Sequence, residues 1–181
     1  GYTIPWMRPN HSYTTSKRLS TDLHDSSHIQ GRQLWRVSMG EVRLWPEHLD
    51  EVVEEFQACF DSMERYELLF EYAKRNPSPL PPEEWNDDNQ VHGCQSRAHV
   101  TCFVDEQGGF QMRGGADAQI VQGLMSVTAM AVNGMSPQEV ASMEPDYAEA
   151  MGVQSSLTPS RANGFLNMFK RVKEDASKLS G

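Results

Sequence analysis

The sequence is poor in positive charge. Its 181 residues contain 16 Lys and Arg against 25 Asp and Glu, which gives a formal net charge of −9 at pH 7. An excess of negative charge repels phosphate backbones and anionic lipid headgroups. We therefore expect neither a nucleic-acid partner nor a membrane partner.

Long apolar runs are also missing. The most apolar stretch, residues 124–132, is interrupted by Ser126 and Thr128, and it is far shorter than the roughly 20 residues that cross a bilayer. The chain opens on Gly1 instead of methionine, and the next residues form neither the basic nor the apolar part of a signal peptide. We expect no transmembrane helix and a chain trimmed at its N-terminus.

Cysteine is scarce, and several catalytic motifs are absent. The three cysteines cannot all pair with one another, which favours a reducing compartment, and we predict a cytoplasmic location. The sequence has no G-x-G-x-x-G, Walker A, G-x-S-x-G or H-E-x-x-H motif. Dinucleotide, NTP, α/β-hydrolase and zinc-protease chemistry therefore lack their usual signatures. We expect no bound cofactor.

Residues 1–45 mix polar side chains with isolated apolar ones at no steady period. We interpret them as an N-terminal extension or arm, and residues 46–181 as the domain. Basic residues and scattered serines in the arm resemble the remnant of an organellar presequence, so a plastid or another organelle is the alternative location. Asp22 and Asp25 count against that alternative. The basic residues are Lys17, Arg18, Arg32 and Arg36.

Two helices are predicted at the start of the domain. Asp61 followed by Glu64 has the form of a capping box that opens the second helix. Residues 77–89 contain four prolines, which exclude a helix or a central strand there, so we expect an ordered loop. The buried face of the first helix is predicted from the i, i+3, i+4 spacing of Leu49, Val52, Val53, Phe56 and Phe60.

A hairpin and further helices follow. Alternating side chains predict a strand over residues 97–104 and a return strand over residues 110–113, which Gly114 and Gly115 end. Later helices are expected after caps at Asp117, Ser136 and Thr158, with the last one running to about Lys178. This order of elements predicts an α+β fold, a small antiparallel β-sheet with helices packed on one face.

A cysteine stands in the loop just before the first predicted strand. Gly93 lets the backbone turn sharply and leaves room for an incoming sulfur, while the N–H groups after Cys94 can face a thiolate. A free cysteine can also be only a small packing residue. We take Cys94 as the candidate nucleophile, supported by the loop residues His92, Gly93, Gln95 and Ser96.

The other two cysteines are expected in the core, because Cys59 and Cys102 fall on apolar faces. A zinc site or cluster scaffold is an alternative, since four candidate ligands lie within eleven residues: His92, Cys94, His99 and Cys102. In a regular strand, however, His99 and Cys102 point to opposite faces, so we predict no metal site. A Cys-dependent hydrolase with a histidine base is a further alternative.

Arg161 is unusual for its position. It lies in the first turn of the predicted last helix, where a cation opposes the helix dipole at a cost of roughly 0.3–1 kcal/mol. An anionic partner would offset that cost.

Three blocks of the sequence are similar to the SufE family of sulfur-acceptor proteins, which includes CsdE. The blocks are VHGCQSRAH around Cys94, GGADAQIVQGLMSV over residues 114–127 and LTPSRANGF over residues 157–165. The resemblance covers about residues 46–178. It implies the fold shared with IscU-type iron–sulfur scaffolds.

By this resemblance, Cys94 accepts sulfur as a persulfide from a pyridoxal-phosphate-dependent cysteine desulfurase. The resemblance implies that the acceptor stimulates the desulfurase and passes sulfur to an iron–sulfur scaffold, which favours a transfer partner over a stand-alone enzyme and leaves the enzyme question open. Arg161 matches the arginine of the family's TPSR block and is expected to stabilise the charged sulfur or the docked partner. Asp117 matches an acidic position beside the active loop and is expected to bind the partner or to cap its helix.

Two features depart from the family pattern. His99 stands where family members commonly carry Trp, and the arm has no counterpart in the short bacterial acceptors. An IscU-like scaffold is the less favoured sibling, because its cluster cysteines lie at separated loop positions, whereas Cys59 and Cys102 are predicted in the core.

Overall fold

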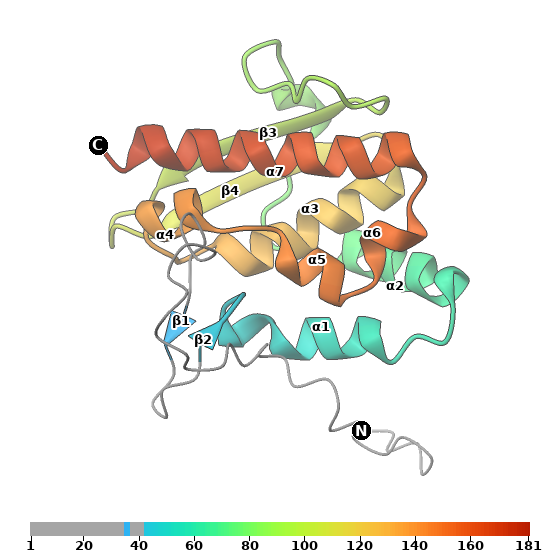
Figure 1. The fold of residues 1–181 in the computed structure, drawn as a ribbon. Coiled ribbons are helices and arrows are strands. Elements are labelled where there is room, and N and C mark those ends of the chain that lie inside the picture. Colours follow the sequence, from blue (N-terminus) through green and yellow to red (C-terminus); the bar gives the residue numbers. More distant parts are fainter. Residues whose placement is uncertain (1–34, 37–41) are drawn as a thin grey trace.

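The computed structural model of the chain describes residues 35–36 and 42–181 (Figure 1). Most of the predicted arm, with its basic residues Lys17, Arg18 and Arg32, lies outside this range. In chain order the elements are β1 (Trp35–Arg36), β2 (Val42–Arg43), the 3-10 helix η2 (Glu47–Leu49), α1 (Asp50–Gln57), α2 (Ser62–Lys74), the 3-10 helix η3 (Pro82–Glu84), β3 (Ala98–Val104), β4 (Phe110–Ala116), α3 (Gln119–Val132), α4 (Pro137–Ser142), α5 (Asp146–Ala150), α6 (Val153–Ser156) and α7 (Pro159–Leu179).

The central sheet is the antiparallel hairpin of β3 and β4, which pair over their full lengths. β4 continues through Gly114 and Gly115, so the prediction that these glycines end the strand is wrong. A Cβ at Gly115 would lie 2.1 Å from the carbonyl oxygen of Leu80. The glycine therefore leaves space for a neighbouring chain segment that crosses very close to the strand.

That neighbour is the predicted proline-rich loop, which pairs with both outer edges of the hairpin. On the β4 edge, the Leu80 N–H donates to the Gly114 carbonyl at 3.0 Å. On the β3 edge, the Val91 N–H donates to the Ala98 carbonyl at 2.8 Å. Residues 77–91 thus run from one edge of the sheet to the other, and both ends of the segment are held by backbone hydrogen bonds.

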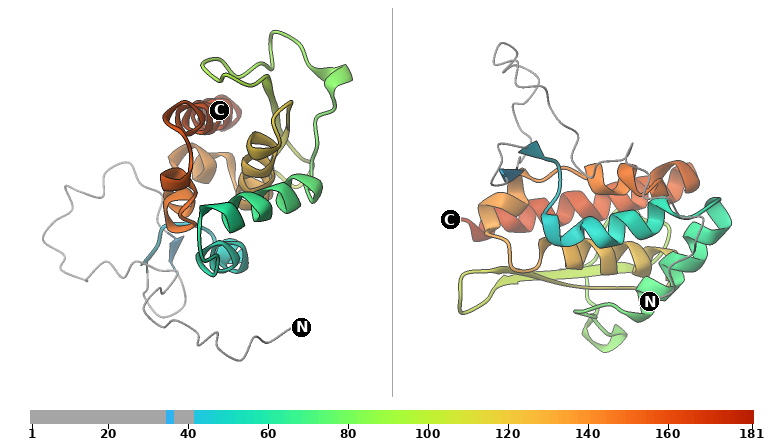
Figure 2. Two further views of the ribbon diagram at one scale, coloured as in Figure 1. Left: turned by 90° about the vertical axis from the view of Figure 1, so that its right-hand side faces the viewer. Right: turned by 90° about the horizontal axis from the view of Figure 1, so that it is seen from below.

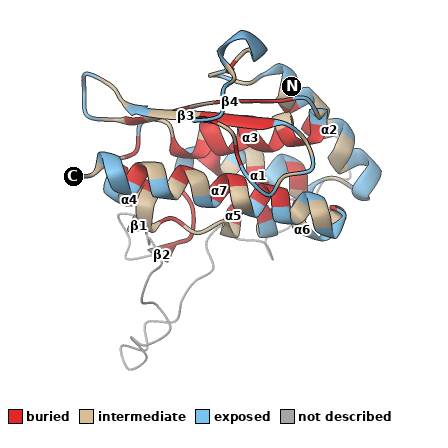
Figure 3. Ribbon diagram, turned by 90° about the horizontal axis from the view of Figure 1, so that it is seen from above, coloured by how far each residue is buried: buried red, intermediate tan, exposed pale blue. Residues whose placement is uncertain are grey.

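Helices cover one face of the β3–β4 hairpin. α3 packs on β4 and on α2, while α7 packs on β3 and α4. In Figure 2 (left), α7 and α1 are seen nearly end-on, and α2 runs across the view beside α1. Eleven of the 14 residues of α3 are buried, so α3 is the central helix, and Figure 3 shows the buried residues gathered along it. The predicted α+β fold, with helices on one face of a small antiparallel sheet, is confirmed.

The predicted caps of two helices are confirmed. The Asp61 carboxylate accepts a hydrogen bond from the Glu64 N–H at 3.0 Å and opens α2. Ser136 and Glu139 form a complete capping box at the start of α4. α7 has Pro159 at its first position, as predicted, and buries the expected face: Phe165, Met168, Phe169, Val172 and Ala176.

The predicted face of the first helix holds only in part. α1 ends at Gln57, so Phe60 lies beyond the helix in the connection to α2. Its side chain is 90% exposed, and the prediction that it is buried is wrong. The chain turns at this point to bring Asp61 into the cap of α2, which breaks the helical period that the spacing implied.

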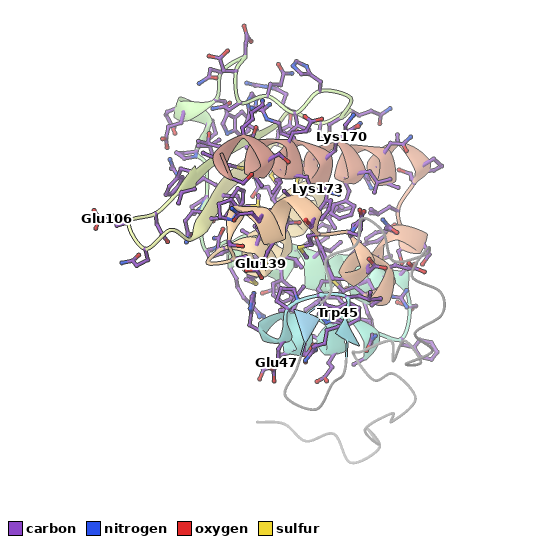
Figure 4. All side chains as sticks on the ribbon, turned by 60° about the vertical axis from the view of Figure 1, so that its left-hand side comes forward. Trp45, Glu47, Glu106, Glu139, Lys170 and Lys173 are labelled. Carbon is purple, nitrogen blue, oxygen red and sulfur yellow. The ribbon has the colours of Figure 1, made fainter. Side chains whose placement is uncertain are left out.

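The residues just before η2 belong to the core. Leu44 and Trp45 are buried, and the Trp45 indole N–H donates to the Asp50 carboxylate at 3.0 Å. Arg43 forms an ion pair with the same carboxylate. The Glu47 side chain, two residues after Trp45, points away from the molecule (Figure 4). The division of the chain at residue 45 stays a prediction.

No helix among the described residues is long and apolar enough to cross a membrane.

Candidate functional site

Cys94 lies in a tight loop closed by the edge of the sheet. The Val91 N–H to Ala98 carbonyl bond joins the two ends of the loop, which spans residues 92–97. Gly93 has φ +81°, a conformation that side-chain-bearing residues rarely adopt. The turn at Gly93 places Cys94 at the surface, half-buried.

α7 forms the wall against which the thiol packs. A Cβ at Gly164 would lie 2.9 Å from the Cys94 Sγ, so the thiol occupies the space that a side chain would fill. One turn further, the Asn167 side-chain amide donates to the Gly93 carbonyl at 3.1 Å. Gly164 and Asn167 therefore fix the loop on the helix, although they lie about 70 residues away from it in the sequence.

Arg161 shares this side of α7. It lies three residues before Gly164, and side chains at this spacing are neighbours on a helix surface, with about 5–6 Å between Cβ atoms. Arg161 is exposed and has no hydrogen bond or ion pair with any described residue. Arg161, Gly164 and the Asn167 amide thus follow one another at a spacing of three residues along the helix.

Asp117 anchors the other side of the loop. Its carboxylate accepts a hydrogen bond from the Arg97 N–H at 3.0 Å, and its own N–H donates to the Arg97 carbonyl at 3.0 Å. The prediction that Asp117 caps the next helix is wrong, because Ala118 is the N-cap of α3 and makes no side-chain cap bond. The carboxylate is already used by the backbone of the Cys94 loop.

An aromatic stack supports the base of the loop. The Trp85 ring, from the proline-rich segment, stacks on His99 with ring centroids 4.7 Å apart and planes 13° apart. The Arg97 guanidinium lies 5.1 Å from the centroid of the Trp85 ring, within the range of a cation–π contact. Trp85 thus packs an aromatic ring directly against His99 at the base of the loop.

The burial of His99 in this stack disfavours the protonated form of its imidazole. His99 is buried, and its Nδ1 lies 2.8 Å from the Asn89 side-chain oxygen. Burial, and next the positive charge of Arg97, lower the pKa of the imidazole. His99 is therefore a structural residue of the loop base.

The remaining predicted site residues lie where the loop places them. His92 and Gln95 are exposed and Ser96 is half-buried. The Cys94 loop is thus bonded to Asp117 at its base, and Arg161 lies one helical turn before Gly164 on the α7 face that the thiol contacts. The residues that sequence reasoning missed are Trp85, Arg97, Gly164 and Asn167. The one signal was a glycine inside a predicted helix, which often marks a close packing contact.

The other two cysteines have different surroundings. Cys59 is half-buried and lies outside the core, so its predicted core position is wrong. Cys102 is also half-buried but packs against the core. Burial raises the pKa of both thiols, with further contributions from the carboxylate of Glu64 at Cys59 and that of Asp175 at Cys102. A raised pKa depletes the reactive thiolate.

The alternatives from sequence find little support in the geometry of the described part of the chain. His99 faces Trp85, whereas Cys102 lies near Asp175 of α7, so the two side chains do not converge. Within residues 42–181, no group of three or more His, Cys, Asp or Glu side chains is arranged to hold a metal ion. No hydrogen bond joins the Cys94 thiol to a histidine of that range, as a Cys–His nucleophile requires.

Comparison with known proteins decides the family. The profile of a family described as "SufE: Fe-S metabolism associated domain" matches residues 50–176. The chain belongs to the SufE family. This membership associates it with iron–sulfur metabolism, and it confirms the resemblance drawn from the three sequence blocks.

Individual SufE relatives agree with this assignment. An uncharacterised SufE-like protein of Synechocystis is 41% identical over 131 residues, which are 72% of this chain and 81% of that protein. SufE-like protein 1 of Arabidopsis thaliana, described as chloroplastic/mitochondrial, is 34% identical over 134 residues. Those residues are 74% of this chain but only 36% of the plant protein.

A solved structure shares the SufE fold described above. The solution structure of a hypothetical protein from Thermus thermophilus superposes with a TM-score of 0.61 at 25% identity. The match covers 75% of this chain and 97% of that protein.

Proposed function

We propose that this protein accepts sulfane sulfur on Cys94 from a pyridoxal-phosphate-dependent cysteine desulfurase and delivers it to iron–sulfur cluster assembly. The observation that carries the proposal is the contrast among the three cysteines. Cys94 lies in a glycine-opened surface loop, whereas Cys102 lies on β3 against the core and Cys59 lies in the connection after α1. Transfer between proteins requires a thiol that the donor can reach.

The transfer is a thiol–disulfide-type exchange. The Cys94 thiolate attacks the terminal sulfur of the donor's cysteine persulfide, a new S–S bond forms on Cys94, and the S–S bond of the donor breaks. The donor cysteine leaves as a thiolate, and the terminal sulfur keeps its proton. No external oxidant or reductant is consumed, because the oxidised sulfur atom only changes its carrier.

Arg161 is the cation that we assign to this step. Its guanidinium has no partner among the described residues and stands one helical turn from the helix contact of Cys94. From there it can stabilise the thiolate and the persulfide anion, or pair with a carboxylate of the docked donor. A bound anion also offsets the unfavourable position of the cation at the start of α7.

Asp117 is proposed to assist docking indirectly. Its carboxylate holds the Arg97 backbone at 3.0 Å and so sets the outline of the loop that the donor meets. His92, Gln95 and Ser96 complete that outline.

The decisive experiment measures where sulfur is deposited. The protein is incubated with a cysteine desulfurase and cysteine, and intact and peptide masses are recorded without reductant. We expect one added sulfur atom on Cys94, no addition in Cys94→Ser, and normal addition in the matched variants Cys59→Ser and Cys102→Ser. Equal labelling of Cys59 or Cys102 in the wild-type protein would contradict the proposal.

The compartment is a separate question. Cysteine usage predicts the cytoplasm, and the chloroplastic/mitochondrial description of the plant relative supports the organellar alternative. We propose the cytoplasm, and imaging of the full-length protein in its own cells tests this location. Import into an organelle would establish the alternative.

A further inference from the structure

The negative charge of the chain is concentrated in one part of the molecule. Residues 47–74, which form η2, α1 and α2, contain nine carboxylates and two Lys or Arg residues. This segment therefore carries a net charge of −7 out of −9 for the whole chain. Such a localised field attracts a cationic partner and accelerates its association.

A groove opens on this acidic part of the surface. It has a volume of about 800 Å³ and lies along α2 beside the end of α1. We call it the α2 groove. Its walls are mainly apolar and acidic: Ala58, Cys59, Leu68 and Phe70 with Glu55, Glu64, Glu67 and Glu71, joined by Gln119 and by Lys74, which forms an exposed ion pair with Glu71.

Two large apolar side chains next in sequence to residues of the α2 groove, Phe60 after Cys59 and Met63 before Glu64, are exposed. Phe60 is 90% exposed and Met63 is 64% exposed, the two highest values among the exposed large hydrophobic side chains of the described residues. Aromatic residues and Met are enriched at protein interfaces, and an apolar patch with a polar rim marks an interaction site. Met also adapts its shape to a partner.

We propose that the α2 groove binds a basic amphipathic helix of a partner protein. Lys and Arg on one face of that helix would meet Glu64, Glu67 and Glu71, and its apolar face would meet Leu68, Phe60 and Met63. A helix suits the site because α2, with 13 residues, offers about 20 Å of groove length, and the α2 groove is lined by helical and connecting residues without a strand edge.

This surface is distinct from the Cys94 site. None of the residues that line the α2 groove comes from the Cys94 loop or from α7. The proposal therefore uses residues other than those assigned to sulfur transfer and does not depend on it.

Binding is tested with a synthetic helical peptide of Lys and Leu, about 14 residues long, whose Leu residues form one face. Titration of the full chain by isothermal calorimetry should give a micromolar Kd. Phe60→Ala with Met63→Ala should weaken binding by about tenfold or more, as expected for interface anchors. Phe103→Ala, which removes a half-exposed aromatic on β3, is the matched control and should leave the Kd unchanged.

A scrambled peptide of the same composition separates recognition from simple charge attraction. Equal affinity for both peptides, or an unchanged Kd in the double variant, would overturn the proposal. A tenfold gain in affinity for Lys17→Glu with Arg18→Glu would also overturn it, because the chain's own basic arm would then be the occupant.

The position of the peptide is read from cysteine alkylation. Cys59 lines the α2 groove, so bound peptide should slow its reaction with iodoacetamide several-fold and leave that of Cys94 unchanged. Protection of Cys94 instead would overturn the assignment of the site. Peptide binding should persist in Cys94→Ser, so a failure here and a failure of the sulfur-transfer proposal are distinguished.

Discussion

The Cys94 thiol packs against α7 at Gly164, where the absence of a side chain leaves room for the sulfur. Gly164 lies in the helix interior, where glycine costs roughly 0.5–1 kcal/mol relative to alanine. The position is buried against Cys94. We infer that this cost is retained because the thiol needs the space.

Gly164→Ala should therefore separate stability from function. The new Cβ, 2.9 Å from the Cys94 Sγ, must displace the thiol, and we expect sulfur acceptance to fall about tenfold, equivalent to about 1.4 kcal/mol of the barrier. The free energy of unfolding, measured in urea, should not fall by more than about 1 kcal/mol, since helix propensity improves. Asn163→Ala, at an exposed position one residue earlier, is the control. An unchanged acceptance rate in Gly164→Ala would show that the contact is not functional.

Arg161 gives a second test at this scale. We expect Arg161→Ala to reduce the rate of sulfur transfer by about tenfold and Arg161→Lys to recover only part of it, because Lys keeps the charge without the planar fork. Single-turnover transfer from a persulfidated desulfurase measures both. The melting temperature should not fall, because the side chain is exposed and has no partner among the described residues, and Arg161→Ala should raise it slightly by removing a cation from the start of α7. Full activity of the alanine variant would remove Arg161 from the site.

At the scale of elements, two side-chain hydrogen bonds hold the Cys94 loop in place. Asp117 links its base to the start of α3, and Asn167 links its turn to α7. Trp85 packs on His99 and Arg97 from the outer side of the sheet. The loop is therefore a fixed connection between three elements and not a free surface turn.

Loss of the hydrogen bond between Asp117 and the Arg97 N–H should increase local opening of the Cys94 loop. Asp117→Ala removes the acceptor for the Arg97 N–H, and a hydrogen bond of this kind contributes about 0.5–1.5 kcal/mol. We expect a loss of that size in urea denaturation and faster hydrogen exchange of the Arg97 amide, with α7 unaffected. Asp117→Asn keeps an oxygen acceptor and should retain most of the protection. Equal protection of the Arg97 amide in the wild type and both variants would show that the Asp117 hydrogen bond does not hold the loop.

The Trp85 stack predicts a pH dependence of stability. The pKa of His99 is lowered in the folded protein, so below about pH 6.5 the unfolded chain binds a proton that the folded chain does not. Stability should therefore fall as the pH drops through that window, by less than about 1.4 kcal/mol per pH unit. His99→Phe keeps the stacking and should lose this part of the pH dependence, as urea denaturation at pH 7 and pH 5.5 will show. Identical pH profiles for both proteins would contradict it.

At the scale of the whole molecule, periodic patterns predicted the elements and missed the contacts between them. Alternation over residues 97–104 and the capping box at Ser136 depend on neighbours within a few residues, so the sequence reports them directly. The roles of Gly115 and Gly164 depend on segments 35 and 70 residues away in the chain, respectively, namely Leu80 and Cys94. Such contacts leave no local pattern.

The candidate site shows the same division. Cys94 and its glycine-opened loop were predictable because the turn is a local property of Gly93. The binding partner of Asp117 was not, because an acidic residue before a helix has the form of a cap whether its carboxylate turns to that helix or to another strand. Phe60 was misplaced for a related reason: the apolar spacing continues past the residue where α1 ends.

The arrangement of the sheet edges has a consequence for how this protein can meet others. Along β4, the groups at Phe110, Met112 and Gly114 that face outward are already bonded to Met135, Asn133 and Ser78. The backbone groups on this edge of β4 are therefore not available to pair with a strand of another protein. The same edge cannot act as a template on which copies of the chain aggregate by strand pairing. A partner that meets the protein at that edge therefore has to bind through side chains and not by adding a β-strand.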